Sequence, residues 1–443
     1  MLSLWQRVAT IGDRPGGSHF FSQLRFAFAV LVTGGLVGLV GGLLYLLLRD
    51  LDLLRRMAIE RVAGWSISPL LVFGAVGAAA VTAAAWLAKR FAPNAAQAGI
   101  AYSTVSGHDE DERSVPADIS VNFAGTALAA GAGLAIGPER PAQQVAEAIS
   151  RVIAPLFGLT RAEVRLLAAA AGGAGIATMF NAPLGCAVYT VHMILRRTNF
   201  KIGVTALGAG AMAVAVERVL LGSSKNFAVT ALEAIPLRVL LLYLLLGAGI
   251  GLISWVHQYL ASVAVQRIGG RRPNVLLRAA VVGGAVGILA WVAPAVVGPG
   301  DAVVQGIFEG HFEPWHIAVL LGARLLLGPV SIAAGTPGGY FTPALAIGAL
   351  AGAGFASLCG GIGGLSIEPS AFEIAGMAAA LSALHRAAFT GVLLTIETTG
   401  AFQVLLPAAV AAFGAGVVTA GLGSPSLAEC LARVGALQPK PQP

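Results

Sequence analysis

Residues 335–354 read GTPGGYFTPALAIGALAGAG, and their amino-acid composition changes abruptly along the stretch. The first part is rich in glycine and proline, which interrupt helices, whereas the second part is rich in alanine and leucine, which favour them. The change lies between two long apolar segments, at 315–334 and 340–363. The pattern therefore predicts a helix that begins just after Pro337, Gly338 and Gly339, in the interior of an apolar region.

The composition places this region in a membrane. Of the 443 residues, 57% are hydrophobic and only 11% are charged, against about 25% charged in an ordinary soluble domain. The 58 glycines suit membrane helices, whose backbones approach closely through small residues. The net charge of +7 comes from basic clusters between apolar runs, which is typical of loops that set membrane topology and not of nucleic-acid binding. The composition predicts an all-α, multi-pass protein of the lipid bilayer.

Apolar stretches long enough to cross a bilayer, about 20 residues, occur along most of the chain. Basic loops face the cytoplasm, which places Lys89–Arg90 and the cluster around Arg196 and Lys201 on that side, together with Arg267–Arg278. The acidic loop from Asp301 to Glu313 is expected on the opposite side. The predicted apolar segments are Phe26–Leu48, Ile67–Ala88, an almost continuous run from Ile119 to Leu195, and roughly 203–221, 236–265, 276–299, 315–334, 340–363 and 371–422.

Several other breaks interrupt these apolar runs, at Gly137-Pro138, Pro141, Pro183 and Pro343. Backbone without helical hydrogen bonds survives in a bilayer only when it is buried in protein or lines a cavity, so the breaks indicate a transport pathway. Each break exposes unpaired N–H groups at the positive end of a helix dipole. Two such ends near the midplane form a binding site for an anion, which is the predicted substrate.

The breaks recur in two halves of the chain. Residues 137–141 (GPERP) align with 339–343 (GYFTP) at a shift of 202, and 181–190 (NAPLGCAVYT) align with 386–395 (RAAFTGVLLT) at a shift of 205. Few residues are identical between the two halves, but the aligned stretches keep the same order and spacing. Broken helices at corresponding places in two halves mark a site at the repeat interface. We therefore expect two inverted repeats, at roughly 25–221 and 236–435.

These residues resemble the CLC family of chloride channels and chloride/proton exchangers. Its signatures have the forms GSGIP, GREGP and GGxFxP. The third is intact as Gly338-Gly339-Tyr340-Phe341-Thr342-Pro343, the second is altered to Gly137-Pro138-Glu139-Arg140-Pro141, and the first survives only as Ala98-Gly99-Ile100-Ala101. The resemblance covers about residues 25–435 and is typical of a divergent bacterial member.

The resemblance implies roles for individual residues. The backbone N–H groups of Tyr340 and Phe341 would hold the central anion, with Gly99, Ile100, Gly137, Gly338 and Gly339 completing the anion site. Glu139 would be the gating carboxylate, which competes with the anion and moves aside when it is protonated. The residue type supports this independently, since a carboxylate within the membrane is costly and marks function. Its alternative role is a salt bridge to Arg140.

The chain also departs from the family pattern. The positions of the family's two anion-binding hydroxyls are Ala98 and a residue near Leu427, which have none. The internal proton-relay glutamate of exchangers falls at Met193, which cannot titrate, although the neighbouring His192 could. Glu397, the repeat partner of His192, is expected to be a buried structural carboxylate that pairs with a basic residue such as Arg386 or Arg324. These departures favour channel-like or weakly proton-coupled chloride movement, with stoichiometric chloride/proton antiport as the alternative.

Other functional classes fit the sequence less well. An intramembrane enzyme would need a zinc-binding HExxH helix or a catalytic Ser or Asp pair, and an ATP-driven pump would need a phosphate loop; no cofactor or metal is therefore expected. A cation- or amino-acid-coupled transporter would need intramembrane clusters of Asp, Asn or Ser, which are sparse here, and a structural scaffold does not explain Glu139 beside a helix break. A broken-helix secondary transporter outside the CLC family is the remaining alternative. The resemblance implies a homodimer in the bacterial inner membrane. The expected organisation is a cytoplasmic segment at 1–24, a transmembrane domain at 25–435 and a short tail at 436–443.

Overall fold

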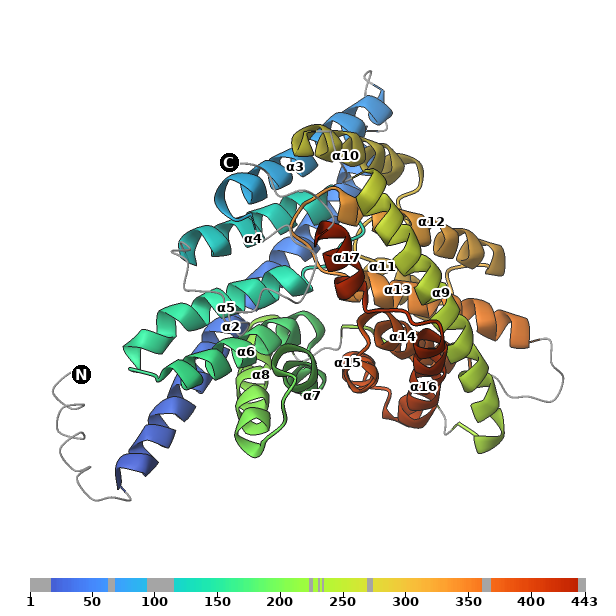
Figure 1. Cartoon of the computed structure of the whole chain (residues 1–443). Helices are drawn as coiled ribbons and strands as arrows, with labels where there is room; N and C mark the ends of the chain where they lie inside the picture. The colour runs from blue at the N-terminus through green and yellow to red at the C-terminus, as the bar shows by residue number, and fades with distance from the viewer. Residues whose placement is uncertain are drawn as a thin grey trace.

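The computed structural model describes residues 17–62, 68–93, 115–222, 226–229, 232, 235–268, 274–360 and 368–436. These residues are almost entirely helical, and within them the only isolated β-bridge joins Gly137 to Gly339 (Figure 1). The helices of the first half are α2 (Gly17–Val62), α3 (Pro69–Phe91), α4 (Val115–Gly131), α5 (Glu139–Leu156), α6 (Arg161–Phe180), α7 (Pro183–Tyr189), continued by a π-helical turn (Thr190–Leu195), and α8 (Phe200–Leu221). Those of the second half are α9 (Leu240–Arg267), α10 (Val275–Val292), α11 (Asp301–Phe308), α12 (Pro314–Ala333), α13 (Phe341–Cys359), α14 (Pro369–His385), α15 (Ala388–Thr399), α16 (Leu405–Gly421) and α17 (Leu427–Ala436).

Nine helices among the described residues are long and apolar enough to cross a membrane. The prediction of a multi-pass, all-α protein is thus confirmed. The first expected span, Phe26–Leu48, lies inside α2, which has 46 residues. The long apolar run at 371–422 is divided into α14, α15 and α16, because the backbone turns left-handed at Arg386 (φ 57°) and at Gly400 (φ 68°), which ends a helix.

The internal repeat is visible in the backbone. Gly133 (φ 100°) and Gly335 (φ 77°) are 202 residues apart and both precede a helix that starts inside the protein. Asn181 (φ 52°) and Arg386 (φ 57°) are 205 residues apart and are the left-handed caps of α6 and α14. In Figure 1, α5 and α13 leave a common central point and run in opposite directions. These matching features relate the two halves of the chain.

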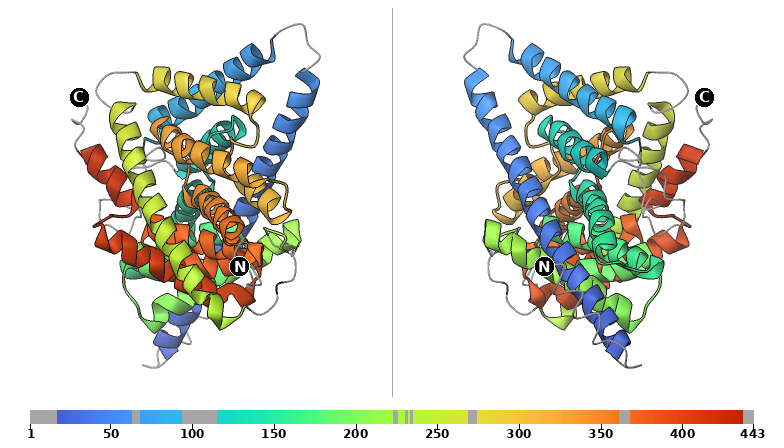
Figure 2. Two further views of the ribbon diagram at one scale, coloured as in Figure 1. Left: turned by 90° about the vertical axis from the view of Figure 1, so that its right-hand side faces the viewer. Right: turned by 90° about the vertical axis from the view of Figure 1, so that its left-hand side faces the viewer.

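Small residues allow the helices to pack closely. A side chain on Gly77 of α3 would overlap the backbone of Gly283 and Gly287 of α10, and one on Gly348 of α13 would overlap Gly376 of α14. The two views of Figure 2 show the helices crossing one another at steep angles around the centre of the molecule. The glycine content therefore serves close contact between helix backbones.

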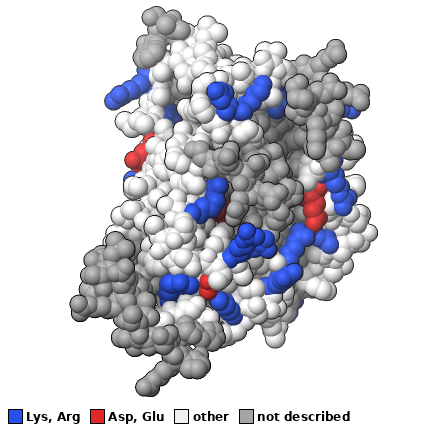
Figure 3. All heavy atoms as spheres, turned by 60° about the vertical axis from the view of Figure 1, so that its left-hand side comes forward, with Lys and Arg blue, Asp and Glu red and all other residues white. Residues whose placement is uncertain are grey.

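Basic residues are numerous on one face of the molecule. Figure 3, which brings the left-hand side of Figure 1 forward, shows many Lys and Arg side chains on that face. An ion pair of 3.9 Å joins Lys201, at the start of α8, to Glu163, at the start of α6. Gly158, in the turn between α5 and α6, lies beside Arg25 of α2. The C-terminal end of α5 therefore lies on the basic face, which the positive-inside rule assigns to the cytoplasm.

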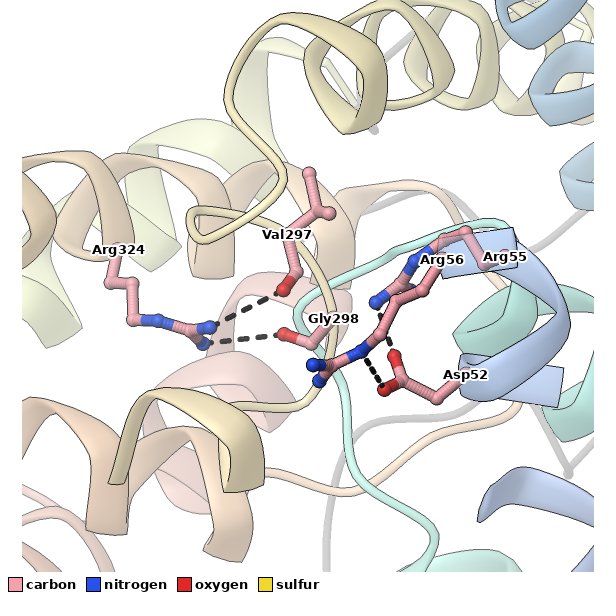
Figure 4. A network of polar contacts seen from close by, with 6 residues as sticks. All are labelled: Asp52, Arg55, Arg56, Val297, Gly298 and Arg324. Carbon is pink, nitrogen blue, oxygen red and sulfur yellow. Dashed lines mark hydrogen bonds and ion pairs between the residues drawn. The ribbon is translucent and has the colours of Figure 1, made fainter. Parts of the chain in front are cut away.

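A buried arginine holds the segment that leads into α5. Arg324 of α12, 2% exposed, donates hydrogen bonds to the carbonyl oxygens of Val297 (3.4 Å), Gly298 (3.2 Å) and Pro299 (3.2 Å) (Figure 4). The N–H of Gly298 in turn donates to the carbonyl of Gly133 (2.7 Å). Nearby, Asp52 of α2 pairs with Arg55 and Arg56. Arg324 thus fixes a loop that is bonded to Gly133, at the start of the segment that leads into α5.

We expect Arg324→Ala to destabilise the protein by a few kcal/mol. Hydrogen bonds to charged groups contribute about 1.5–3 kcal/mol each, and the substitution leaves three backbone carbonyls without this donor. The measurement is the midpoint of thermal unfolding of the purified protein in detergent. Arg49→Ala is the control, since the side chain of Arg49 is 55% exposed and its one ion pair among the described residues is with Asp50. Equal midpoints for the two variants would contradict the proposed support.

Candidate functional site

Two helices begin at the same point in the interior of the protein. The N–H of Gly137 donates to the carbonyl of Gly339 (2.9 Å), and the N–H of Gly339 donates to the carbonyl of Gly137 (2.6 Å). Two residues after this bridge, α5 starts at Glu139 and α13 starts at Phe341. The first N–H groups of a helix have no partner within it, so the bridge brings two positive helix ends together.

The carboxylate of Glu139 lies across the start of α13. Its Oε1 accepts a hydrogen bond from the backbone N–H of Thr342 (2.7 Å) and another from the Thr342 hydroxyl. Glu139 is fully buried, and its Oε2 has no hydrogen-bond partner among the described residues. The carboxylate therefore occupies the position in which an anion would meet the N-terminus of α13.

The structure brings together most of the residues predicted for the site. A Cβ atom on Gly137 or on Gly339 would meet the Glu139 carboxylate, and Gly338, Tyr340 and Phe341 flank Gly339 in the turn that leads into α13. The remaining predicted residues, Gly99 and Ile100, lie outside the described residues, as does Ala98.

Aromatic rings fix the start of α13. The ring of Phe341 stacks on His385 (4.2 Å between centroids) and meets the edge of Tyr189 (5.5 Å). A ring nitrogen of His385 lies 3.3 Å from the carbonyl oxygen of Tyr340. The ring of Tyr340 stacks on His257 of α9 (5.2 Å). The Tyr340 side chain is thus packed against α9, and its backbone forms part of the turn into α13.

The charges around the site leave the Glu139 carboxylate without a counter-ion. Among the described residues, no ion pair joins it to Arg140. Arg140 instead interacts electrostatically with Tyr189 and Glu147. The described residues also contain no group of three or more His, Cys, Asp or Glu that could hold a metal ion. The chemistry of the site is therefore that of helix N-termini and one carboxylate.

Glu397 has a different partner from the one expected. Its two carboxylate oxygens accept hydrogen bonds from the N–H groups of Leu184 (3.1 Å) and Gly185 (2.6 Å) in the first turn of α7. Arg386 donates to Thr419 instead (3.2 Å), and Arg324 binds backbone carbonyls. The predicted arginine partner was wrong, because the unpaired N–H groups at a helix start satisfy a carboxylate equally well.

Three residues concern the predicted departures from the family pattern: Met193, His192 and Leu427. Met193 is buried, whereas His192 is exposed and its ring lies 5.7 Å from that of Phe389. Leu427 is buried at the start of α17. His192 is therefore on the outside of its helical turn, and a proton-relay role for it stays a prediction.

Sequence reasoning missed several polar residues at the site. Thr342 was part of a recognised motif, but its bond to Glu139 joins residues 203 positions apart. Gln143 and Glu147 carry a signal that could have been used: they are polar residues in a long apolar region and lie four residues apart, on one face of α5. Tyr189 and His385 carry no signal that separates them from ordinary core residues.

Comparison with known proteins identifies relatives of the chain. The model of the voltage-gated chloride channel family matches residues 77–420. The chain is 31% identical, over 424 residues, to the H+/Cl− exchange transporter ClcA of Vibrio cholerae serotype O1; the match covers 92% of this chain and 89% of the relative.

Solved structures share the fold. A slow cyanobacterial Cl−/H+ antiporter superposes with a TM-score of 0.86 at 27% identity, covering 94% of this chain and 99% of that one. A CLC-type fluoride/proton antiporter superposes with a TM-score of 0.75 over 93% of this chain and 98% of that one; at 19% identity this likeness concerns the fold alone. The family match over most of the chain and the paired helix starts lead to one conclusion: the chain belongs to the CLC family of voltage-gated chloride channels and their relatives.

Proposed function

We propose that the chain exchanges chloride for protons across the membrane. The observation that carries the proposal is the position of the Glu139 carboxylate, which accepts hydrogen bonds at the α13 N-terminus where chloride would bind. The names of the relatives support the same function, since both ClcA and the cyanobacterial structure are described as exchangers of chloride and protons. They favour antiport over the channel-like movement that the sequence suggested through Met193.

The geometry supplies a reason why chloride movement would be coupled to proton movement. Glu139 accepts its hydrogen bonds from Thr342, and chloride would accept from the adjacent N–H groups of Tyr340 and Phe341 in the turn into α13. A carboxylate and a chloride ion this close together repel each other, so the two compete for the helix start. Protonation removes the negative charge of Glu139 and weakens its hold on the Thr342 donors. The neutral side chain then moves aside and chloride enters. One group thus links the binding of a proton to the binding of an anion.

The anion site is proposed to consist of backbone amides. Tyr340 and Phe341 would supply N–H groups at the start of α13, with the region of Gly99 and Ile100 completing the site. The site lacks the two family hydroxyls, because Ala98 and Leu427 have none. Partial charges of this kind bind an anion and still allow it to leave.

The assembly follows from the family resemblance. We place a homodimer, with one pathway in each subunit, in the bacterial inner membrane, with residues 25–435 forming the membrane domain. Exposed large apolar side chains on α7, α8, α15 and α16, including Leu184, Val204, Phe389 and Phe413, provide faces for lipid or for the second subunit.

Transport by purified protein in proteoliposomes tests the function. With a chloride gradient and the membrane potential clamped by a potassium ionophore, we expect protons to move against their own gradient in exchange for chloride. Empty vesicles are the control. Chloride movement without any proton movement would identify a channel-like protein and overturn antiport. Absence of chloride movement above the control would overturn chloride transport altogether.

A further inference from the structure

A second carboxylate lies buried in α5, and the site described above does not use it. Glu147 follows Glu139 by eight residues, which places it about 12 Å further along the helix. It is 6% exposed, and it takes part in none of the ion pairs between described residues. A carboxylate inside a membrane protein is costly and is a functional candidate.

Two hydrogen bonds and one aromatic contact connect Glu147 with the site. The side-chain amide of Gln143 donates to Glu147 Oε1 (3.0 Å), and the hydroxyl of Tyr189 donates to Gln143 Oε1 (3.2 Å). The edge of the Tyr189 ring contacts the ring of Phe341, the first residue of α13. Hydrogen bonds therefore lead from Glu147 to the Tyr189 hydroxyl, and the ring of Tyr189 packs against the helix start that binds Glu139.

The neighbouring helix leaves room for this carboxylate. Glu147 packs against Gly172 of α6, where a Cβ atom would come within 2.9 Å of Glu147 Oε1. Two arginines of α5, Arg140 and Arg151, interact electrostatically with the Glu147 carboxylate. Arg151 is itself paired with Asp118 of α4 (2.5 Å), and one terminal nitrogen of Arg140 has no hydrogen-bond partner. The Glu147 carboxylate thus lies between Gly172 of α6 and charged groups of its own helix.

The direction of α5 determines on which side of the anion site Glu147 lies. The helix begins at the anion site and ends beside the turn at Gly158, on the basic face of the molecule. Glu147 therefore lies between the Glu139 site and the side assigned to the cytoplasm. The family resemblance places a relay glutamate at Met193, whose side chain has no titratable group. The neighbouring His192 is exposed beside Phe389.

We infer that Glu147 is the cytoplasmic-side proton-binding residue of the transport cycle. The inference rests on the proposed antiport. The carboxylic acid of Glu147 releases its proton and becomes a carboxylate, and the carboxylate of Glu139 takes up a proton and becomes neutral. Gln143, Tyr189 and Arg140 supply hydrogen-bonding groups for the water that carries the proton between them. Glu147 then takes a new proton from the cytoplasm.

Two substitutions test this role in the proteoliposome assay, with chloride and proton movement recorded together. We expect Glu147→Gln to move chloride while proton movement falls to the level of empty vesicles. Tyr189→Phe removes only the hydroxyl that bonds to Gln143, and we expect it to lower the number of protons moved per chloride. Because the second change is nearly isosteric, it tests the route even if the first variant does not fold.

Two further variants serve as controls. Glu217→Gln alters a carboxylate of α8 that is equally buried, at 5% exposed, and is expected to keep the proton-to-chloride ratio of the parent. His192→Ala tests the competing relay. An unchanged ratio in both Glu147→Gln and Tyr189→Phe, or loss of proton movement in His192→Ala alone, would overturn the inference while leaving antiport intact. Absence of proton movement in the parent protein would instead overturn the antiport on which the inference rests.

Discussion

Glu139→Gln is expected to abolish proton movement completely and to make chloride movement independent of pH. The amide has the size of the carboxylic acid but carries neither a titratable proton nor a negative charge. It therefore resembles the protonated side chain, which holds the N–H and hydroxyl of Thr342 less strongly than the carboxylate does. Chloride no longer competes with a charged group and the pathway stays open to it.

The measurement is chloride release and proton uptake by proteoliposomes over a range of pH. In the parent protein, acidification protonates Glu139 and should raise chloride movement; in the variant the profile should be flat. Glu373→Gln is the matched control, since Glu373 is 4% exposed on α14 and is not bonded to Thr342. A variant that keeps the pH profile of the parent would show that Glu139 is not the gate.

The helix starts at the site could be predicted because their signals are local. Glycine and proline interrupt the apolar pattern at 137–141 and 338–343, and these residues begin α5 and α13. Both helices carry proline at their third residue, Pro141 and Pro343, where a missing N–H costs no helical hydrogen bond. Local sequence therefore located the two helix starts, and its prediction of an anion rests on them.

Contacts between distant parts of the chain could not be predicted in the same way. The partners of Glu139 and of Glu397 are more than 200 residues away in sequence, and for Glu397 a backbone partner replaced the expected arginine. The end of α14 was also missed, because its left-handed cap is Arg386 (φ 57°) and not a glycine. Such positions are set by packing, which can hold a residue in a conformation that its type disfavours.

Glu147 was missed for another reason. The polar residues of α5 recur on one face, which in a soluble protein indicates a surface helix. In a membrane protein the same pattern can face the protein interior. Here Gly172 of α6 receives the carboxylate. The spacing of the polar residues does not by itself distinguish the two cases, and the long apolar region around α5 is the signal that could have done so.

Gly137→Ala is expected to expel the Glu139 carboxylate from the anion site without breaking the backbone. The three atoms nearest to a Cβ at this position all belong to the carboxyl group of Glu139, which is the end of a flexible side chain. Gly137 is not among the residues with a left-handed backbone, so alanine can adopt its conformation. The carboxylate would lose its bonds to Thr342, and hydrogen bonds to charged groups contribute about 1.5–3 kcal/mol. Since 1.4 kcal/mol is tenfold in affinity, chloride should bind about tenfold more tightly.

Calorimetric titration of the purified protein with chloride at neutral pH measures this effect. The matched control is Gly131→Ala, because a Cβ there would make only ordinary contact with Leu51, at 3.6 Å or more. The decisive comparison uses Glu139→Ala, in which no carboxylate remains to be displaced. Adding Gly137→Ala to that variant should leave chloride affinity unchanged, since the two substitutions act through the same group. If their effects instead add, the alanine acts on the backbone amides themselves, and the carboxylate is not what competes with chloride at the start of α13.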